Sequence, residues 1–171
     1  MKLRTFVTTL ILTLCLFGCS PTTRPLVWKA KGVDINNFSA FEIQQAINPT
    51  GKRIEQEILS LLTAYLIDEF EVKNLQLIDY PQTKSNVLTV RTEILVYEVK
   101  LFMSPAPPLK DKIAQCILRT RLYQKSSNIV VAEIVTVNQI DVGQGLFEPK
   151  NSEDVLKESA AAVAAEVAKI I

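Results

Sequence analysis

The stretch NPTGKRIEQEILSLLTAYLIDEF, residues 48–70, is the strongest structural signal in the sequence. Asn48 suits the N-cap of a helix, and Pro49 suits the first helical position because it has no amide hydrogen to donate. The apolar side chains that follow recur at helical spacing and form one stripe, made of Ile54, Ile58, Leu61, Leu62, Tyr65 and Leu66. The stretch therefore predicts an amphipathic core helix from about Thr50 to Phe70.

Strand signals lie on both sides of this helix. Before it, apolar and polar side chains alternate around Phe41 and Ile43, which predicts a strand over residues 38–47. After it, apolar and β-branched runs predict four strands, over residues 75–78, 87–103, 113–124 and 129–140. The apolar parity of the longest run switches near Leu95, which predicts a β-bulge there. Between the last two strands, the run KSSN at residues 125–128 is typical of a hairpin turn.

Residues 151–171, at the end of the chain, predict a second helix. Asn151 or Ser152 is the expected N-cap, and the acidic pair that follows favours the positive end of the helix dipole. The element order is then β-α-β-β-β-β-α. It predicts an α+β fold: a two-layer sandwich with a mostly antiparallel four- to five-stranded sheet and two helices on one face. A crossover through the first helix is long enough to allow one parallel strand pair.

Composition excludes several classes of function. The 171 residues suffice for a single domain, and 19 basic against 18 acidic side chains give no basic excess for binding nucleic acid. The sequence has no histidine, so it contains no Ser-His-Asp or Cys-His nucleophile and no histidine-ligated zinc. Carboxylates at residues 68–71 and 153–154 fit solvated helix ends, and Cys116 fits a small core residue. We predict no enzyme activity, no cofactor and no metal.

The N-terminus has the layout of a secretory signal. Basic Lys2 and Arg4 precede an apolar run over residues 6–17. Twelve helical residues reach about 18 Å, which is short of the ~30 Å hydrocarbon core of a bilayer, so a membrane-spanning helix is the weaker interpretation. A secretory signal of this kind is compatible with an ordinary secreted protein or with a protein that is anchored to a membrane by lipid.

Leu16-Phe17-Gly18-Cys19 resembles the bacterial lipobox. The resemblance implies cleavage before Cys19, with diacylglycerol on its sulfur and a third acyl chain on its amino group. It divides the chain into a signal peptide (residues 1–18), a lipidated N-terminus with a tether (19–32) and a single α+β domain (33–171). In bacteria with two membranes, Ser20 after the modified cysteine resembles the outer-membrane default. The protein is then expected on the periplasmic face of the outer membrane or, in a host with one membrane, on the outer surface of that membrane.

The whole layout resembles a group of small bacterial envelope lipoproteins. Over residues 38–171, a strand, a long amphipathic helix, a short strand, a β-meander and an alanine-rich closing helix follow the lipobox. The N-terminal domain of the translocation protein TolB, the curli-secretion lipoprotein CsgG and the penicillin-binding-protein activator LpoB share this order. The layout is also similar to auxiliary lipoproteins of ABC-type lipid-transport systems. The resemblance implies a fold and a compartment, and Cys19 is the one functional residue that it carries over.

One loop is expected to bind a partner. The segment LFMSPAPPL, residues 101–109, combines apolar side chains with three prolines, which pre-order the backbone and reduce the entropy lost on binding. A pre-ordered apolar hairpin tip suits docking to an envelope protein. The alternative is that these side chains cap the open end of the sandwich. The predicted contact residues are Phe102, Met103, Pro105, Pro107, Pro108 and Leu109.

Three further side chains have two interpretations each. Trp28, the single tryptophan, either packs on the domain or anchors in the membrane interface. Arg119 and Arg121 share one strand face and either receive a phosphate or carboxylate or belong to an ordinary polar surface. The expected function is that of a lipid-anchored, non-enzymatic accessory or assembly factor that binds an envelope protein. The alternative is a lipid-handling auxiliary of an ABC-type transporter, which needs an apolar cleft between sheet and helices.

Overall fold

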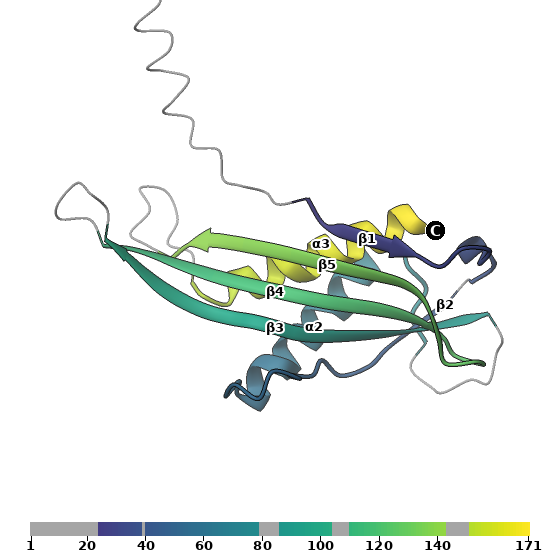
Figure 1. The fold of residues 1–171 in the computed structure, drawn as a ribbon, viewed down its shortest axis with the longest axis horizontal. Coiled ribbons are helices and arrows are strands. Elements are labelled where there is room, and N and C mark those ends of the chain that lie inside the picture. Colours follow the sequence, from purple (N-terminus) through teal and green to yellow (C-terminus); the bar gives the residue numbers. More distant parts are fainter. Residues whose placement is uncertain (1–23, 39, 79–85, 104–109, 143–150) are drawn as a thin grey trace, which may run out of the picture.

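The computed structural model describes residues 24–38, 40–78, 86–103, 110–142 and 151–171. Its elements follow the order β1 (Leu26–Lys29), a 3-10 turn η1 (Ile35–Asn37), β2 (Ala40–Ile43), α2 (Gln56–Val72), β3 (Val87–Met103), β4 (Lys110–Gln124), β5 (Ile129–Asp141) and α3 (Asp154–Ile170). Figure 1 shows the long strands β3, β4 and β5 side by side, with α2 and α3 behind them. The chain therefore has the α+β fold that the sequence predicts.

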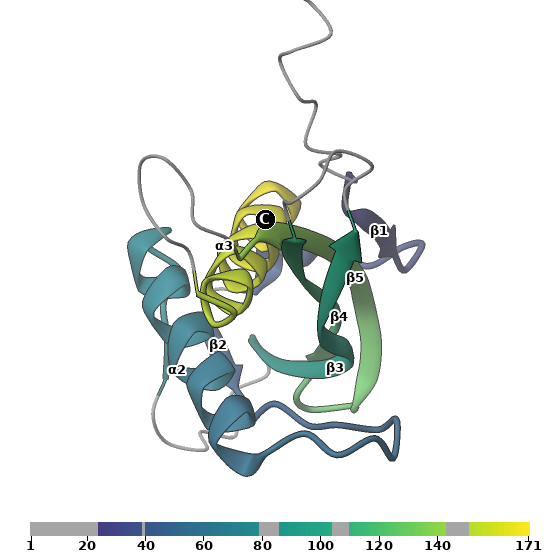
Figure 2. The same cartoon turned by 90° about the vertical axis from the view of Figure 1, so that its left-hand side faces the viewer.

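Over the described residues the sheet has the strand order β1-β5-β4-β3-β2. β2 and β3 run parallel, and the other neighbouring strands run antiparallel. The parallel pair is the one that the predicted crossover allows, because α2 connects β2 to β3. The two helices pack together on one face of the sheet (Figure 2), as predicted. The opposite face, which we call the open face, has no helix over it in the described part of the chain.

The predicted strand order is wrong in two places. β1 lies within the stretch assigned to the tether and pairs antiparallel with β5. The predicted strand at residues 75–78 is reduced to one isolated bridge, between Leu77 and Phe41. The order of the regular elements is therefore β-β-α-β-β-β-α. β1 was missed because four residues between a proline and a turn carry no readable alternation, and their strand conformation depends on the hydrogen bonds of β5.

The first helix also begins later than predicted. α2 starts at Gln56, and Asn48 caps a turn instead: its side-chain oxygen accepts hydrogen bonds from the amide and the hydroxyl of Thr50, at 3.0 and 2.7 Å. Gly51 follows with a φ of +71°, a left-handed conformation that ends any helix begun at Pro49. Residues 48–51 therefore form a turn and not the first turn of the predicted helix.

The second helix begins close to the predicted position: α3 starts at Asp154, with Glu153 at the N-cap position, and Asn151 caps the turn that leads into it. The Asn151 side-chain oxygen accepts hydrogen bonds from the backbone amides of Glu153 and Asp154, at 2.7 and 3.1 Å. In return, the Asp154 carboxylate accepts one from the Asn151 amide at 2.7 Å. Asn151, not Ser152, therefore satisfies the first amides of α3.

The core lies between the sheet and the helix pair. Leu62 and Leu66 of the predicted stripe are fully buried, and the remaining members pack against them partly buried. The ring of Phe70 meets that of Phe41 edge to face, with centroids 5.6 Å apart. Fully buried alanines of α3, such as Ala160, let this helix approach its neighbours closely. The core therefore ties both helices to the centre of the sheet.

The predicted bulge and hairpin turn are confirmed. The register of β3 on β4 shifts between Ile94 and Val96, beside Leu95. In the turn after β4, Asn128 has a φ of +54° and donates its amide to the Gln124 carbonyl at 2.8 Å. The bulge also changes which side chains of β3 face the helices, because the extra residue moves each following side chain to the other face of the sheet. Beyond it, odd-numbered residues of β3 lie on the helix side of the sheet.

Candidate functional site

The paired ends of β3 and β4 extend past α2 and α3 as a two-stranded arm (Figure 1). We define the arm as residues 99–103 and 110–113. Two of the predicted contact residues, Phe102 and Met103, are the last residues of β3 and pair in register with β4. The others, Pro105, Pro107, Pro108 and Leu109, lie outside the described residues, as does Cys19.

The helix layer stops at the base of the arm. Tyr97 is half-buried on the helix side of β3, and its hydroxyl donates a hydrogen bond to the Ser152 carbonyl at 3.4 Å. Burial raises the pKa of the Tyr97 hydroxyl above its usual value. Since α3 begins only at Asp154, Tyr97 is the last residue of β3 that the helix end covers.

The arm exposes apolar side chains on the side that the helices leave uncovered, together with one charged residue, Lys112 of β4, which is in register with Leu101 on the same side. Val99 and Leu101 share this side with Tyr97, and they are 46% and 65% exposed. On the other side, Lys100 and Glu98 form an exposed ion pair of 2.6 Å. Exposed apolar side chains gathered on one side of a projecting element are typical of a docking surface.

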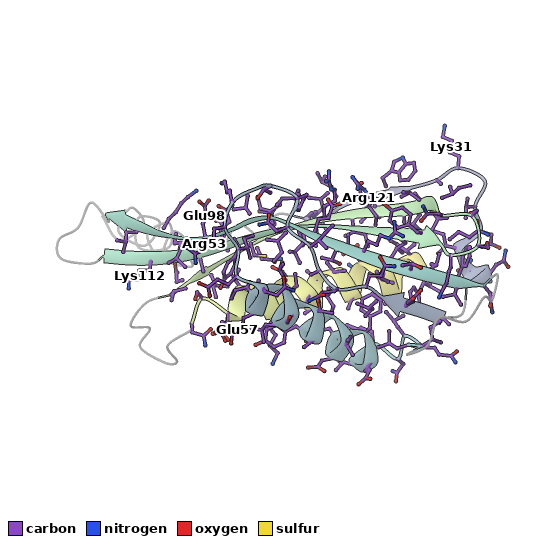
Figure 3. All side chains as sticks on the ribbon, turned by 90° about the horizontal axis from the view of Figure 1, so that it is seen from below. Lys31, Arg53, Glu57, Glu98, Lys112 and Arg121 are labelled. Carbon is purple, nitrogen blue, oxygen red and sulfur yellow. The ribbon has the colours of Figure 1, made fainter. Side chains whose placement is uncertain are left out.

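The two arginines that the sequence put on one strand face do lie together, on the open face. Arg119 donates from Nε to the Glu93 carboxylate at 2.7 Å and also pairs with it through Nη2. Arg121 donates to Glu133 at 2.6 Å and to Glu93 at 3.3 Å. The hydrogen bond to Glu133 is the main cause that raises the pKa of Arg121. Figure 3 shows Arg121 on the side of the sheet away from the helices.

This cluster is neutral as a whole, because two guanidinium groups meet two carboxylates. An incoming phosphate would have to displace Glu93 or Glu133 from charge-assisted hydrogen bonds. The polar-surface interpretation of Arg119 and Arg121 therefore fits the structure better than an anion site. Sequence reasoning missed the two acids because their approach depends on the registers of β3 with β4 and of β4 with β5.

β1 exposes all of its side chains. Leu26, Val27 and Trp28 are 73%, 38% and 54% exposed. The backbone of Trp28 pairs with Glu133 of β5, so the strand docks on the domain while most of the indole stays in solvent. The backbone of Trp28 therefore packs on the sheet, and its exposed side chain is available to another surface; its anchoring in a membrane interface stays a prediction.

A small pocket lies where α2 meets the edge of the sheet. It has a volume of about 230 Å³ and is lined by Glu42, Ile43, Ile67, Leu77 and Ile78. Pockets for small molecules commonly measure about 300–1,000 Å³, so this one is small. This pocket is smaller than the cleft that lipid handling needs.

Cys116 and the carboxylates are the residues that the sequence offered for nucleophilic or metal-binding chemistry. Cys116 is fully buried, and burial raises the pKa of its thiol to about 12, so it has the character of a core residue. Within the described ranges, no group of carboxylates and thiols is placed to hold a metal ion. No helix among these ranges is long and apolar enough to cross a bilayer.

No protein-family model and no curated protein matches the sequence. Solved structures do match the fold. PelC from Paraburkholderia phytofirmans, which was solved as a dodecamer, has a TM-score of 0.51 at 9% identity, covering 82% of this chain and 97% of PelC. The hypothetical protein CT253 from Chlamydia trachomatis has a TM-score of 0.56 at 11% identity, covering 78% of this chain and 97% of its own.

A minor lipoprotein from Acinetobacter baumannii is a more distant match, with a TM-score of 0.46 at 9% identity over 77% of this chain and 91% of its own. At such identities the comparisons bear on the fold. This chain is similar in architecture to bacterial proteins of about its own domain size.

Proposed function

We propose that this protein is a lipid-anchored, non-enzymatic lipoprotein of the cell envelope that binds another protein as an accessory or assembly factor. The observation that carries the proposal is the arm. Val99 and Leu101 expose apolar surface on a hydrogen-bonded two-stranded extension, immediately beside the proline-rich segment that the sequence predicts for docking. Such an element presents its contact residues with little conformational entropy left to lose.

The anchor is supported by the lipobox. Acylation at Cys19 would hold the domain at a membrane surface, because two or three acyl chains together anchor a protein stably where one chain does not. Ser20 favours the outer membrane in a host with two membranes. We also propose, as part of the same function, that the protein is related to the TolB, CsgG and LpoB group of envelope proteins.

The fold itself is compatible with assembly. PelC, whose fold this chain shares, forms a dodecamer. A protein of this shape is therefore able to present surfaces to other protein chains, and further copies of the chain are among the partners that an experiment has to distinguish.

The test is site-specific crosslinking of the full chain in intact cells. A photoreactive residue replaces Leu101 and, in a matched control, the exposed Glu57 of α2, which lies on the helix layer (Figure 3). We expect a discrete adduct from position 101 and none from position 57, with the partner identified by mass spectrometry. Equal adducts from both positions, or none from position 101, would contradict docking through the arm.

The alternative, a lipid-handling auxiliary of an ABC-type transporter, rests on the pocket between α2 and β2. Ile43, Ile67 and Leu77 give the pocket an apolar part that suits a segment of an acyl chain, although polar atoms, with Glu42 among the lining residues, form the larger share of its lining. Native mass spectrometry of the purified protein distinguishes the two functions. Co-purified phospholipid that disappears in an Ile43→Glu variant favours the alternative, and its absence from the wild type counts against it.

A further inference from the structure

A second surface lies far from the arm, around the first strand of the sheet. Leu26, Val27 and Trp28 expose apolar area along β1. The segment that contains them, RPLVWKAKG at residues 24–32, has three basic side chains and no acidic one. We call this segment the β1 patch. Figure 1 shows β1 toward the opposite end of the sheet from the arm.

The position of the patch in the chain limits where it can lie. Seven peptide bonds separate Cys19 from Leu26. An extended chain covers at most about 3.6 Å per residue, so β1 would begin no more than about 25 Å from an acylated sulfur. β1 is the first described strand after the anchor, and its pairing with β5 fixes the rest of the domain to it. A lipid anchor therefore brings this strand to the membrane surface.

The chemistry of the patch suits that surface. Tryptophan is enriched where membrane and water meet, because its ring is apolar and its N–H stays hydrated. Arg24, Lys29 and Lys31 add the charge that attracts anionic headgroups. Figure 3 shows Lys31 reaching away from the body of the domain, on the side opposite the helices.

The neighbouring acid does not oppose this attraction. Glu133 is the residue in register with Trp28, and its carboxylate accepts a 2.6 Å hydrogen bond from Arg121. Its charge is thus compensated within the open-face cluster. The basic side chains of the patch then lie in the same segment as the tryptophan, and the Glu133 carboxylate is already engaged by Arg121.

We propose that the β1 patch docks on an anionic phospholipid bilayer, with the Trp28 indole in the interfacial region. This inference rests on the proposed lipid anchor at Cys19. Docking would supply a second membrane contact beside the acyl chains, and it would fix the orientation of the domain with the arm pointing away from the patch.

The single tryptophan makes this directly measurable. The full lipidated chain is reconstituted in phosphatidylcholine vesicles with or without phosphatidylglycerol, and Trp28 emission is recorded with lipids brominated near the headgroup. We expect a blue shift and a loss of emission in the anionic vesicles, as for an indole in the membrane interface, and a smaller shift and loss in the neutral ones. Replacing Arg24, Lys29 and Lys31 by Gln should remove the difference between the two lipid compositions.

The matched control moves the reporter. In a Trp28→Phe, Val72→Trp variant the indole sits at an exposed position on the end of α2, and brominated lipid should leave its emission unchanged. Flotation with the vesicles is measured on every sample. A chain that fails to float contradicts the anchor itself. A chain that floats while Trp28 stays accessible to aqueous quencher contradicts only the docking. An indole shielded from water but not quenched by brominated lipid indicates a second copy on the patch, and it also overturns the inference.

Discussion

The Tyr97 hydroxyl donates to the Ser152 carbonyl across 3.4 Å, and this contact marks where the helix layer stops covering β3. On the body side of it, the strand faces a closed core. On the far side, Val99 and Leu101 continue the same row of side chains into solvent. The boundary between fold and docking surface therefore falls within a few residues of one strand.

Leu101→Asp should reduce capture of the partner without unfolding the domain. Leu101 is 65% exposed, so its replacement removes little packing, and we expect a change in the free energy of unfolding within about 0.5 kcal/mol. Urea unfolding and co-purification of the crosslinked partner are the measurements. Lys100→Ala is the control: it lowers the net charge by the same amount as Leu101→Asp, but its side chain lies on the opposite side of β3, so capture of the partner should stay intact. Loss of capture in both variants would refute a one-sided surface.

Glu93→Gln should destabilise the domain more than Glu133→Gln. Glu93 is bonded to both arginines and its side chain is 15% exposed, whereas Glu133 is bonded to Arg121 alone and is 33% exposed. Neutralising Glu93 takes away the acid that both guanidinium groups share and leaves Arg119 without its carboxylate partner, at a cost of about 1–2 kcal/mol. Neutralising Glu133 leaves both arginines paired with Glu93, so its cost should be below about 1 kcal/mol. Chemical denaturation at low and high salt measures both, and the reverse ranking would contradict the cluster geometry.

Thr63→Val should cost about 1–2 kcal/mol although the two side chains have nearly the same shape. The Thr63 hydroxyl accepts a hydrogen bond from the backbone amide of buried Ala46 at 2.9 Å, and it donates one to the Leu59 carbonyl at 2.8 Å. Valine leaves the Ala46 amide without its acceptor. Thr63→Ser keeps the hydroxyl and should recover most of the loss. Equal unfolding free energies for the valine and serine variants would disprove this role.

Cys116 should make stability fall in alkali. Its pKa is raised to about 12 in the folded protein, above that of an unfolded thiol near 8.5, so the unfolded chain releases the proton first. The contribution is complete below about pH 8.5 and is lost as the pH rises toward 12, at up to about 1.4 kcal/mol per pH unit. Unfolding free energies of wild type and Cys116→Ala, compared from pH 8 to 10.5, isolate this slope. Parallel curves would show that the thiol does not titrate in this way.

Local patterns in the sequence predicted much of this fold. The stripe around Leu62 and Leu66, the parity switch at Leu95 and the turn at Asn128 each depend on residues close together in the chain. The start of α2 could not be predicted in this way, because it depends on the left-handed conformation of Gly51. The strand β1 could not be predicted either, because its pairing partner, β5, lies more than a hundred residues away in the chain.

The candidate site was predictable to the same degree. The proline content of residues 101–109 indicated a docking segment, but the exposure of Val99 and Leu101 depends on where α3 begins. The pairing of Arg119 with Glu93 depends on a cross-strand register that no short motif records.

Metabolic labelling with radioactive palmitate tests the central claim, a lipid anchor at Cys19, most directly. The wild-type chain should incorporate label, Cys19→Ser should incorporate none, and Cys15→Ser should be labelled like the wild type because Leu14 before it is not the small residue that a lipobox requires. Incorporation that persists in Cys19→Ser, or no incorporation in the wild type, would contradict the account.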